Sequence, residues 1–312
     1  MMVTFNKMNI VPVDPLRSIN SGQVFLWEKY NNSWYGIDGN YVLKLTLNNK
    51  ELFKFNVNVK NHLELENIEI DYNSSPENKN WIYHYFRLYD NQEKINKTLS
   101  KDQIIFNIYK KYRGLRLIRQ DPFQCLISFV CASNTNIKRI RYMLKNISRK
   151  FGKKVIYDGI EFNLFPNVNE LSQASIQDLI DCGLGYRAKF VRSISNEIKS
   201  NLDLKSLKDM KYLHAKSELT KLYGIGNKIA DCILLFSLEK TEAFPIDIWV
   251  YRCLCQYYGW MFENISIKKN KKISEKEYKL VLKNINEYFG EYSGYVQQYL
   301  YYHIRDSNKR KW

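Results

Sequence analysis

The stretch LYGIGNKIADCILLFSLEKTEAFPID, residues 222–247, decides the fold that we expect for this chain. It holds a Gly-x-Gly turn at Gly224 and Gly226 between two helical runs, then Lys228, and then Asp247 nineteen residues further on. Glycines leave the backbone of a turn uncovered, so such a turn can approach a phosphate closely. The stretch therefore predicts two helices joined by a hairpin that grips a nucleic-acid backbone.

Lys228 and Asp247 stand at positions that suit chemistry. Lys228 falls in the first turn of the second helix, where the helix dipole disfavours an ammonium and favours the neutral, nucleophilic amine. Asp247 directly precedes the run IWVYRCLCQYY, which is the position of a helix N-cap. Taken alone, the lysine is typical of a surface residue or a phosphate contact, and the aspartate is typical of a helix cap. In this order after the hairpin, they predict one site on a nucleic acid.

Composition limits the class of protein. A chain of 312 residues with 45% hydrophobic residues is long enough for about two globular domains. Its formal charge of +16 indicates a polyanionic partner, either nucleic acid or an anionic membrane surface. The sequence has no apolar run near twenty residues and no signal segment, which favours nucleic acid and an intracellular protein.

The cysteines and histidines predict no metal centre. The six cysteines are scattered without a Cys-x-x-Cys pair, and they are Cys125, Cys131, Cys182, Cys232, Cys253 and Cys255. We expect reduced thiols that mostly pack in the core. No cysteine follows Cys255, which excludes an iron–sulfur loop in the C-terminal part.

The N-terminal third has the pattern of an antiparallel meander. Short β-type runs at 23–29, 33–39, 40–48 and 51–57 are separated by Asn and Gly turns, residues 63–72 suit a further strand, and 81–90 suit a covering helix. From about Lys101 the apolar period becomes helical and stays so. The predicted fold is α+β: an antiparallel-sheet domain over 1–100, a mainly α-helical domain over 101–312, and the substrate in the cleft between them.

Several segments carry a specific resemblance. They are SGQVFLW (21–27), GLRLIRQDPFQCLISFVCASNTNIKRI (114–140), GLGYRAKFV (183–191), GIGNKIADC (224–232) and FPID (244–247). In this order and with similar intervals, they resemble the 8-oxoguanine DNA glycosylase/AP lyases, the eukaryotic-type branch of the helix-hairpin-helix DNA glycosylase superfamily. The resemblance covers nearly the whole chain, and it implies base flipping from duplex DNA.

The resemblance assigns the chemistry to Lys228 and Asp247. Departure of a purine develops positive charge on the sugar, which the Asp247 carboxylate would stabilise. Lys228 would trap C1′ as a Schiff base, which permits β-elimination of the 3′ phosphate. Gly224 and Gly226 would hold the DNA backbone.

The resemblance also implies a pocket for the lesion base, formed by Gly22, Cys232, Gln297 and Tyr301. 8-Oxoguanine carries N7–H where guanine has an acceptor, so the Gly22 carbonyl would favour the lesion. Gln297 would face the Watson–Crick edge. Tyr301 stands where the family usually has phenylalanine, so its hydroxyl needs a partner.

The resemblance also implies four residues that fill the gap left by the flipped base or contact the opposite strand. Asn134 would fill the gap left by the flipped base, although a helix cap is the favoured local alternative. Tyr186 would be the wedge beside the unpaired base, with a buried aromatic as the alternative. Arg139 and Arg187 would read the opposite cytosine, with phosphate contacts as the alternative. Trp249 departs from the family's usual phosphate-binding histidine, and it cannot supply a cation.

The predicted function is excision of 8-oxoguanine opposite cytosine from duplex DNA, with AP lyase activity. We expect a monomer that requires no cofactor and is located with DNA in the cytoplasm, nucleoid or nucleus. Whether a structural monovalent or divalent cation binds the hairpin carbonyls stays an open question. One alternative is a glycosylase for another base, but such relatives normally carry the cysteine cluster absent here. A noncatalytic DNA-binding protein is the other, and retention of Lys228 and Asp247 counts against it.

Overall fold

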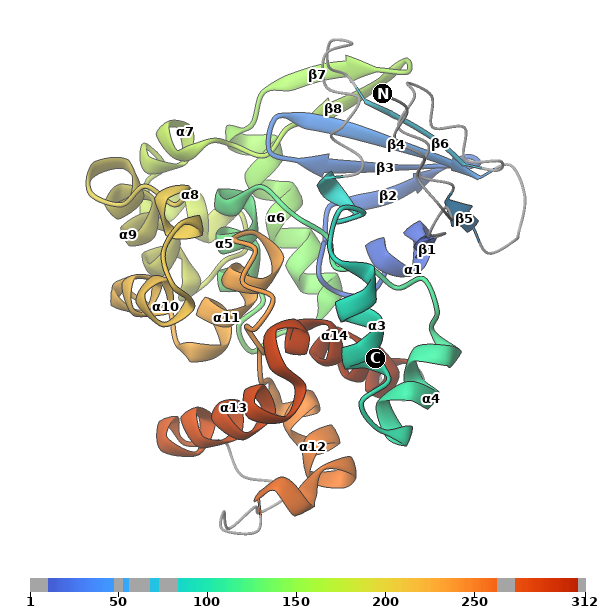
Figure 1. Ribbon diagram of the computed structural model, residues 1–312. Coiled ribbons are helices and arrows are strands. Elements are labelled where there is room, and N and C mark those ends of the chain that lie inside the picture. The colour runs from blue at the N-terminus through green and yellow to red at the C-terminus, as the bar shows by residue number, and fades with distance from the viewer. Residues whose placement is uncertain (1–10, 48–52, 56–67, 73–83, 263–272, 308–312) are drawn as a thin grey trace, which may run out of the picture.

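The computed structural model describes residues 11–47, 53–55, 68–72, 84–262 and 273–307. It has an antiparallel sheet at one end and a larger helical domain below it, so the predicted α+β class is confirmed (Figure 1). Among the helices in the described ranges, none combines the length and apolar character that a membrane span requires. All six cysteines are free, and five of them are buried.

The main sheet is the predicted meander with one change of partner. The strands of the N-terminal part are β1 (Val11–Val13), β2 (Trp27–Tyr30), β3 (Ser33–Asp38), β4 (Tyr41–Leu47), β5 (Phe53–Phe55) and β6 (Ile68–Tyr72). The sheet order is β2-β3-β4-β6, all antiparallel. Strand β6 confirms the strand predicted over 63–72 for residues 68–72, while 63–67 lie outside the described residues. The turns use left-handed backbone at Asn31 and Gly39. Strand β5 leaves the meander and pairs with β1.

One face of the sheet packs on the segment predicted to be a covering helix. Trp27 on β2 is buried there, and its Nε1 donates a hydrogen bond to the Tyr85 hydroxyl at 3.0 Å. The helix predicted over 81–90 ends at Tyr85, so the prediction is wrong for 86–90, while 81–83 lie outside the described residues. Tyr85, Phe86, Arg87 and Leu88 are all buried, and one helix face cannot bury four consecutive side chains. Arg87 instead adopts left-handed backbone and donates to the Leu235 carbonyl.

The other face of the sheet is covered by a hairpin that the helical prediction missed. It consists of β7 (Lys154–Tyr157) and β8 (Ile160–Asn163), joined by left-handed Asp158 and Gly159. Asp-Gly between two alternating runs is a hairpin signal, so the sequence did contain this element. Phe162 packs with Tyr35 of the sheet, and Lys44 lies 2.8 Å from the Asp158 carboxylate.

The remaining elements are helical. The first set comprises α1 (Pro15–Ile19), α3 (Gln92–Leu99), α4 (Gln103–Lys111), α5 (Pro122–Cys131), α6 (Ile137–Phe151), α7 (Val168–Ser172), α8 (Ile176–Asp181) and α9 (Arg187–Ser200). The second set comprises α10 (Tyr212–Lys221), α11 (Asn227–Phe236), α12 (Ile248–Tyr257), α13 (Glu275–Phe289) and α14 (Ser293–Ser307), with short 3₁₀ turns at Ser206–Lys208, Gly259–Phe262 and Gly290–Tyr292.

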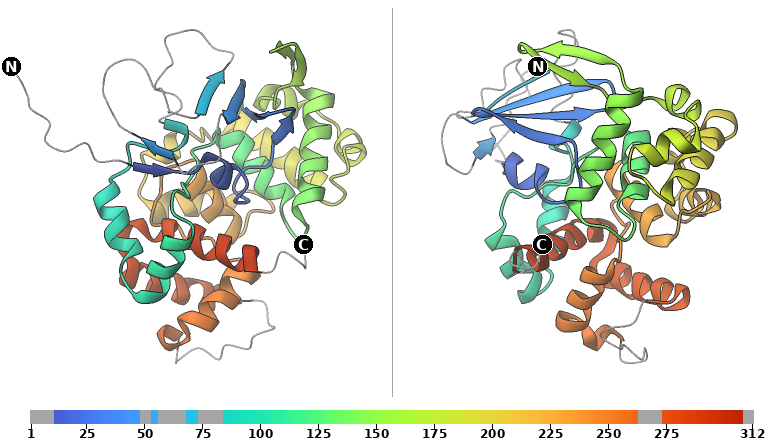
Figure 2. Two further views of the ribbon diagram at one scale, coloured as in Figure 1. Left: turned by 90° about the vertical axis from the view of Figure 1, so that its right-hand side faces the viewer. Right: turned by 180° about the vertical axis from the view of Figure 1, so that it is seen from behind.

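Helix α5 is the centre of the helical core. It begins at the predicted Asp121 cap with Pro122 in its first turn, and all but its first residue are buried. It packs against α6, α9 and α11, and the chain before the sheet adds Phe25 and Leu26 to the same core. Figure 2 shows α6 running up to the sheet, where it leads into β7. Near the end of α5, the Phe129 ring stacks on the Phe236 ring at the end of α11, with a centroid distance of 5.5 Å.

Candidate active site

The predicted hairpin is formed between α10 and α11. Gly224 has φ of +90°, and a Cβ built on it would lie 2.6 Å from Cγ of Phe190. Only glycine fits this position without strain. Gly226 is the N-cap of α11 with ordinary extended backbone, and no atom lies within 4 Å of the place where its Cβ would be. Both glycines are exposed, so the hairpin backbone is open to a ligand.

Lys228 extends from the first turn of α11 into the same region as Asp247. It is half-buried, and its Nζ lies 5.2 Å from the centre of the Phe129 ring on α5. Phe129 was not singled out in the sequence, because a buried helix gives no sign of which ring faces a site. Burial raises the pKa of the Cys232 thiol to about 12, and the Lys228 charge one turn away opposes the rise.

Asp247 caps α12 as predicted. Its Oδ1 accepts the backbone N–H groups of Trp249 and Val250 at 2.9 and 2.8 Å. Burial raises the pKa of Asp247, whereas the charge of Lys228 and these backbone donors lower it. Both of these hydrogen bonds use Oδ1 of the carboxylate.

A cavity of about 730 Å³ joins most of the predicted site residues. Its lining includes Gly22, Asn134, Tyr186, Lys228, Cys232, Asp247, Gln297 and Tyr301, together with Phe25, Phe129, Trp249 and Gln298. Arg139, Arg187, Gly224 and Gly226 lie outside that lining. Gly22 and Tyr301, more than 270 positions apart in the sequence, thus line the same cavity.

Gln297 brings an unused acceptor to the cavity. It lies on α14 and is 4% exposed, and its Nε2 donates to the Pro245 carbonyl at 3.0 Å. Its Oε1 is buried and has no hydrogen-bond partner in the described part of the chain. A buried acceptor without a partner is costly, so this oxygen suits a ligand that donates a hydrogen bond.

Gly22 and Tyr301 lie against each other. Gly22 has φ of +91°, and its Cβ would lie 3.0 Å from Cε1 of Tyr301 and 2.6 Å from Nη1 of Arg305. Burial raises the pKa of Tyr301 to about 12, and the Arg305 charge opposes the rise. Arg305 is thus a charged neighbour of the phenol, and no local sequence pattern relates the two side chains to a base pocket.

Asn134 stands at the exposed tip of the loop between α5 and α6, with φ of +50°. The cap of α6 is Asn136, whose Oδ1 accepts the Arg139 N–H at 2.9 Å. The helix-cap alternative for Asn134 is therefore wrong. Two asparagines in one Ser-Asn-Thr-Asn run cannot be told apart by composition, and the one next to the helical run forms the cap.

The two predicted arginines and Tyr186 surround this loop. Arg187 is 8% exposed, and its Nη2 donates to the Ser133 carbonyl and, at 3.5 Å, to that of Asn134. Arg139 is exposed and donates to the Gly183 carbonyl at 3.0 Å. Tyr186 is 55% exposed, so its buried-aromatic alternative is wrong, and its ring lies 4.5 Å from the Arg187 guanidinium.

Comparison with known proteins agrees with this geometry. The model of the 8-oxoguanine DNA glycosylase N-terminal domain matches residues 5–126, and that of the HhH-GPD superfamily base excision DNA repair proteins matches 127–281. A probable N-glycosylase/DNA lyase of Methanothermobacter thermautotrophicus is 31% identical over 67% of this chain and 70% of its own length. The chain belongs to the 8-oxoguanine glycosylase branch of the HhH-GPD superfamily. It is accordingly a DNA repair enzyme, an N-glycosylase with DNA lyase activity.

Two further relatives extend this result to the glycosylase fold. The N-glycosylase/DNA lyase OGG1 of Arabidopsis thaliana is 34% identical over 64% of this chain, and the alignment spans 55% of that relative. A crystal structure of the Clostridium acetobutylicum 8-oxoguanine glycosylase/lyase, in complex with double-stranded DNA containing cytosine opposite 8-oxoG, superposes with a TM-score of 0.78 at 30% identity. That superposition covers 95% of this chain and 93% of the other.

Trp249 in this glycosylase has a cation beside it. The Arg252 guanidinium lies 5.1 Å from the centre of the Trp249 ring, and Arg252 is exposed. A positive charge therefore lies one turn further along α12, against the tryptophan ring. Residues three apart on a helix are neighbours, so this pairing was available from the sequence spacing.

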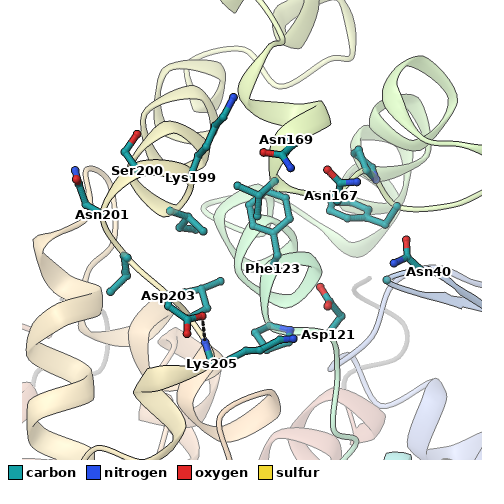
Figure 3. A pocket seen from close by; sticks show the side chains of 18 residues that line it. Asn40, Asp121, Phe123, Asn167, Asn169, Lys199, Ser200, Asn201, Asp203 and Lys205 are labelled. Atoms are coloured by element: carbon teal, nitrogen blue, oxygen red, sulfur yellow. Dashed lines mark hydrogen bonds between the residues drawn. The ribbon is translucent and has the colours of Figure 1, made fainter. Parts of the chain in front are cut away.

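A second cavity of about 710 Å³ lies elsewhere (Figure 3). Asn40, Asp121, Asn167, Asn201 and Lys205 are among the residues that line it, and the predicted site residues are absent from its lining. Among the described residues no cluster of His, Cys, Asp and Glu could hold a metal ion. Lys228 and Asp247 line the first cavity and not this one.

Proposed function

We propose that this glycosylase removes 8-oxoguanine from duplex DNA, prefers cytosine on the opposite strand, and cleaves the resulting abasic site through Lys228. The observation that carries the proposal is the shared cavity, which holds Lys228, Asp247 and the unpaired Oε1 of Gln297. A nucleophile, a carboxylate and a base-reading acceptor are the groups that this reaction requires.

The reaction begins at the sugar. As the bond between C1′ and the base nitrogen breaks, the base leaves with the bonding electrons and the sugar becomes positively charged. Asp247 stabilises that charge through the carboxylate oxygen that its helix cap does not use. The neutral Lys228 amine forms a bond to C1′, and the sugar ring opens to give a Schiff base.

Strand cleavage follows from this intermediate. The protonated imine acidifies the C2′ hydrogen, a base removes that proton, and the 3′ phosphate leaves with the electrons of its C–O bond. Water then hydrolyses the imine and frees Lys228. The Phe129 ring lies against the lysine and is a nonpolar surface that limits water around the amine.

Recognition of the lesion involves the opposite side of the cavity. The Oε1 of Gln297 would accept a hydrogen bond from N1–H or the amino group of a guanine-type base. The Gly22 carbonyl is proposed to accept N7–H, which 8-oxoguanine has and guanine lacks. Tyr301 would stack on the flipped base. Gly22 lies against the Tyr301 ring, so position 22 has no room for a side chain.

The opposite strand is read by the loop at Asn134. Arg139 and Arg187 are proposed to donate to the O2 and N3 acceptors of cytosine, and Asn134 and Tyr186 to occupy the space of the extruded nucleotide. Two exposed features support this arrangement, the loop tip with its left-handed Asn134 and the Tyr186 ring. The hairpin glycines Gly224 and Gly226 would hold the DNA backbone nearby.

Borohydride trapping tests the proposal. With duplexes that contain 8-oxoguanine opposite cytosine, we expect a covalent adduct with the wild-type protein and none with Lys228→Gln. The same assay on a panel of lesions distinguishes a glycosylase for another base, which would give its strongest adduct elsewhere. Absence of any adduct from the wild-type protein would refute the role of Lys228.

A further inference from the structure

A buried carboxylate lies on the same helix as Lys228. Asp231 follows Lys228 by three residues on α11 and is fully buried. Its oxygens accept hydrogen bonds from the Tyr212 hydroxyl at 2.7 Å, the Lys216 ammonium at 2.8 Å and the Tyr278 hydroxyl at 2.6 Å. A buried ion pair is weak support for stability, because desolvation offsets the attraction. The cluster therefore calls for another explanation.

Tyr278 connects this cluster to the segment that carries Asp247. Its hydroxyl donates to Asp231, and the same oxygen lies 3.2 Å from the backbone N of Ile246, whose N–H it accepts. Ile246 immediately precedes Asp247. One phenolic oxygen from α13 thus joins the helix of the nucleophile to the residue before the carboxylate.

The other two partners of Asp231 lack this second contact. Tyr212 and Lys216 both lie on α10, before the hairpin, and within the described part of the chain their side-chain hydrogen bonds join them only to Asp231 and to each other. Tyr212 and Tyr278 are therefore matched in chemistry, since both are buried phenols that donate to one carboxylate. They differ in whether they reach the segment 244–247.

We propose that Tyr278 is a positioning residue that fixes the separation of Lys228 and Asp247. This inference rests on the proposed roles of those two residues. The hydrogen bond from Tyr278 to Asp231 restrains α11 and therefore Lys228. The hydrogen bond from the Ile246 N–H to the Tyr278 oxygen restrains the neighbouring Asp247. Gln297 holds the same segment from the cavity side through the Pro245 carbonyl, so Tyr278 adds a constraint from the opposite side of that segment.

Loss of the Tyr278 hydroxyl should slow the chemical step and leave DNA binding unchanged. Tyr278 is 4% exposed and outside the cavity lining, so it cannot touch the substrate. A displacement near 1 Å between reacting groups costs on the order of 100-fold in rate. Loss of the hydroxyl would free the 244–247 segment on one side and leave DNA contacts intact.

The test compares Tyr278→Phe with Tyr212→Phe in the full-length protein. Single-turnover cleavage of 8-oxoguanine:cytosine duplex should slow by about 10-fold to 100-fold in Tyr278→Phe and by less than about 3-fold in Tyr212→Phe. Both variants should show a similar fall in melting temperature and an unchanged Kd for duplex with a noncleavable abasic analogue. Equal rates in the two variants would overturn the positioning role.

A second variant keeps the test decisive if Tyr278→Phe does not fold. Lys216→Met with Asp231→Leu removes the anchor on α11 without leaving a buried charge unpaired. Its single-turnover rate should fall as in Tyr278→Phe, and an unchanged rate would reject the proposal. Failure of the proposed function is a different result, because the wild-type protein would then give no borohydride adduct at all.

Discussion

The side-chain amide of Gln297 donates a hydrogen bond to the Pro245 carbonyl at 3.0 Å, two residues before Asp247. The contact fixes the rotamer of Gln297, so its Oε1 stays buried at the cavity without a partner among the described residues. A preset acceptor loses little entropy when a base donates to it. The same contact restrains the segment that carries the proposed carboxylate.

Gln297→Met should separate base removal from strand cleavage. Methionine has similar volume but no acceptor for the base, so excision of 8-oxoguanine should slow by about 10-fold to 100-fold. An abasic site has no base to read, so its cleavage should lose only the contribution of the Pro245 contact, which methionine also lacks, and should slow less than excision. Gel assays on the two substrates measure both rates. Equal losses on both substrates would mean that Gln297 acts on the 244–247 segment alone.

Arg187→Lys should lower selectivity for the opposite base. Lysine keeps the charge but loses the planar fork that bonds both the Ser133 carbonyl and a base edge. We expect discrimination between cytosine and adenine to fall by about 1–3 kcal/mol, as the ratio of single-turnover rates reports. Arg139→Ala should act in the same direction. Unchanged ratios in both variants would exclude these arginines as readers of the opposite base.

Local features of the site could be predicted from the sequence. The hairpin glycines, the Asp247 cap and the turns of the meander depend on neighbours within a few residues, and the structure contains each of them. The β7–β8 hairpin is equally local, because its turn depends on the adjacent Asp158 and Gly159.

Contacts between distant segments were beyond the sequence alone. The turn at Arg87 depends on the Leu235 carbonyl, 148 residues away, and the Tyr278 contacts join helices that no short-range pattern relates. The residues that line the base pocket were reached only through a family resemblance. Periodicity predicts which face of α14 is buried but not which cavity Gln297 borders.

Arg252→Ala should weaken DNA binding without slowing chemistry at saturating enzyme. The guanidinium is held over Trp249 at the edge of the cavity, and we expect it to neutralise one phosphate. Removing one phosphate contact should reduce the slope of log Kd against log salt by about 0.9. Arg149→Ala is the matched control, since Arg149 is exposed in the last turn of α6 and borders a different cavity. Equal slopes in the two variants would contradict this role.

Gly224→Ala and Gly226→Ala should differ in stability but agree in DNA binding. Gly224 has left-handed backbone and lies against Phe190, so alanine there should lower the unfolding free energy by about 1–3 kcal/mol. Gly226 has open space and ordinary backbone, so alanine should be nearly neutral. Both methyl groups would obstruct a phosphate at the hairpin and weaken binding. Urea unfolding and fluorescence anisotropy measure the two properties, and full affinity in both variants would remove the hairpin from the interface.

Asp38 should make stability depend on pH at the junction of sheet and helices. Its Oδ1 accepts the Asp121 backbone N–H at 2.9 Å, where β3 meets the start of α5. Burial, followed by the nearby Asp121 charge, raises the pKa of Asp38 to about 8. Because the folded-state pKa lies above the unfolded value, the contribution to stability is complete below about pH 4 and is lost as pH rises towards 8.

Asp38→Asn mimics the protonated acid and keeps the Oδ1 acceptor. The unfolding free energy of the wild-type protein should fall relative to this variant by at most about 1.4 kcal/mol per pH unit between pH 5 and 8. Taking the difference between the two proteins cancels the titration of other buried groups, including Asp231 and Asp247. Urea denaturation at four pH values gives the comparison. Parallel curves would show that Asp38 does not bind its proton more tightly in the folded state.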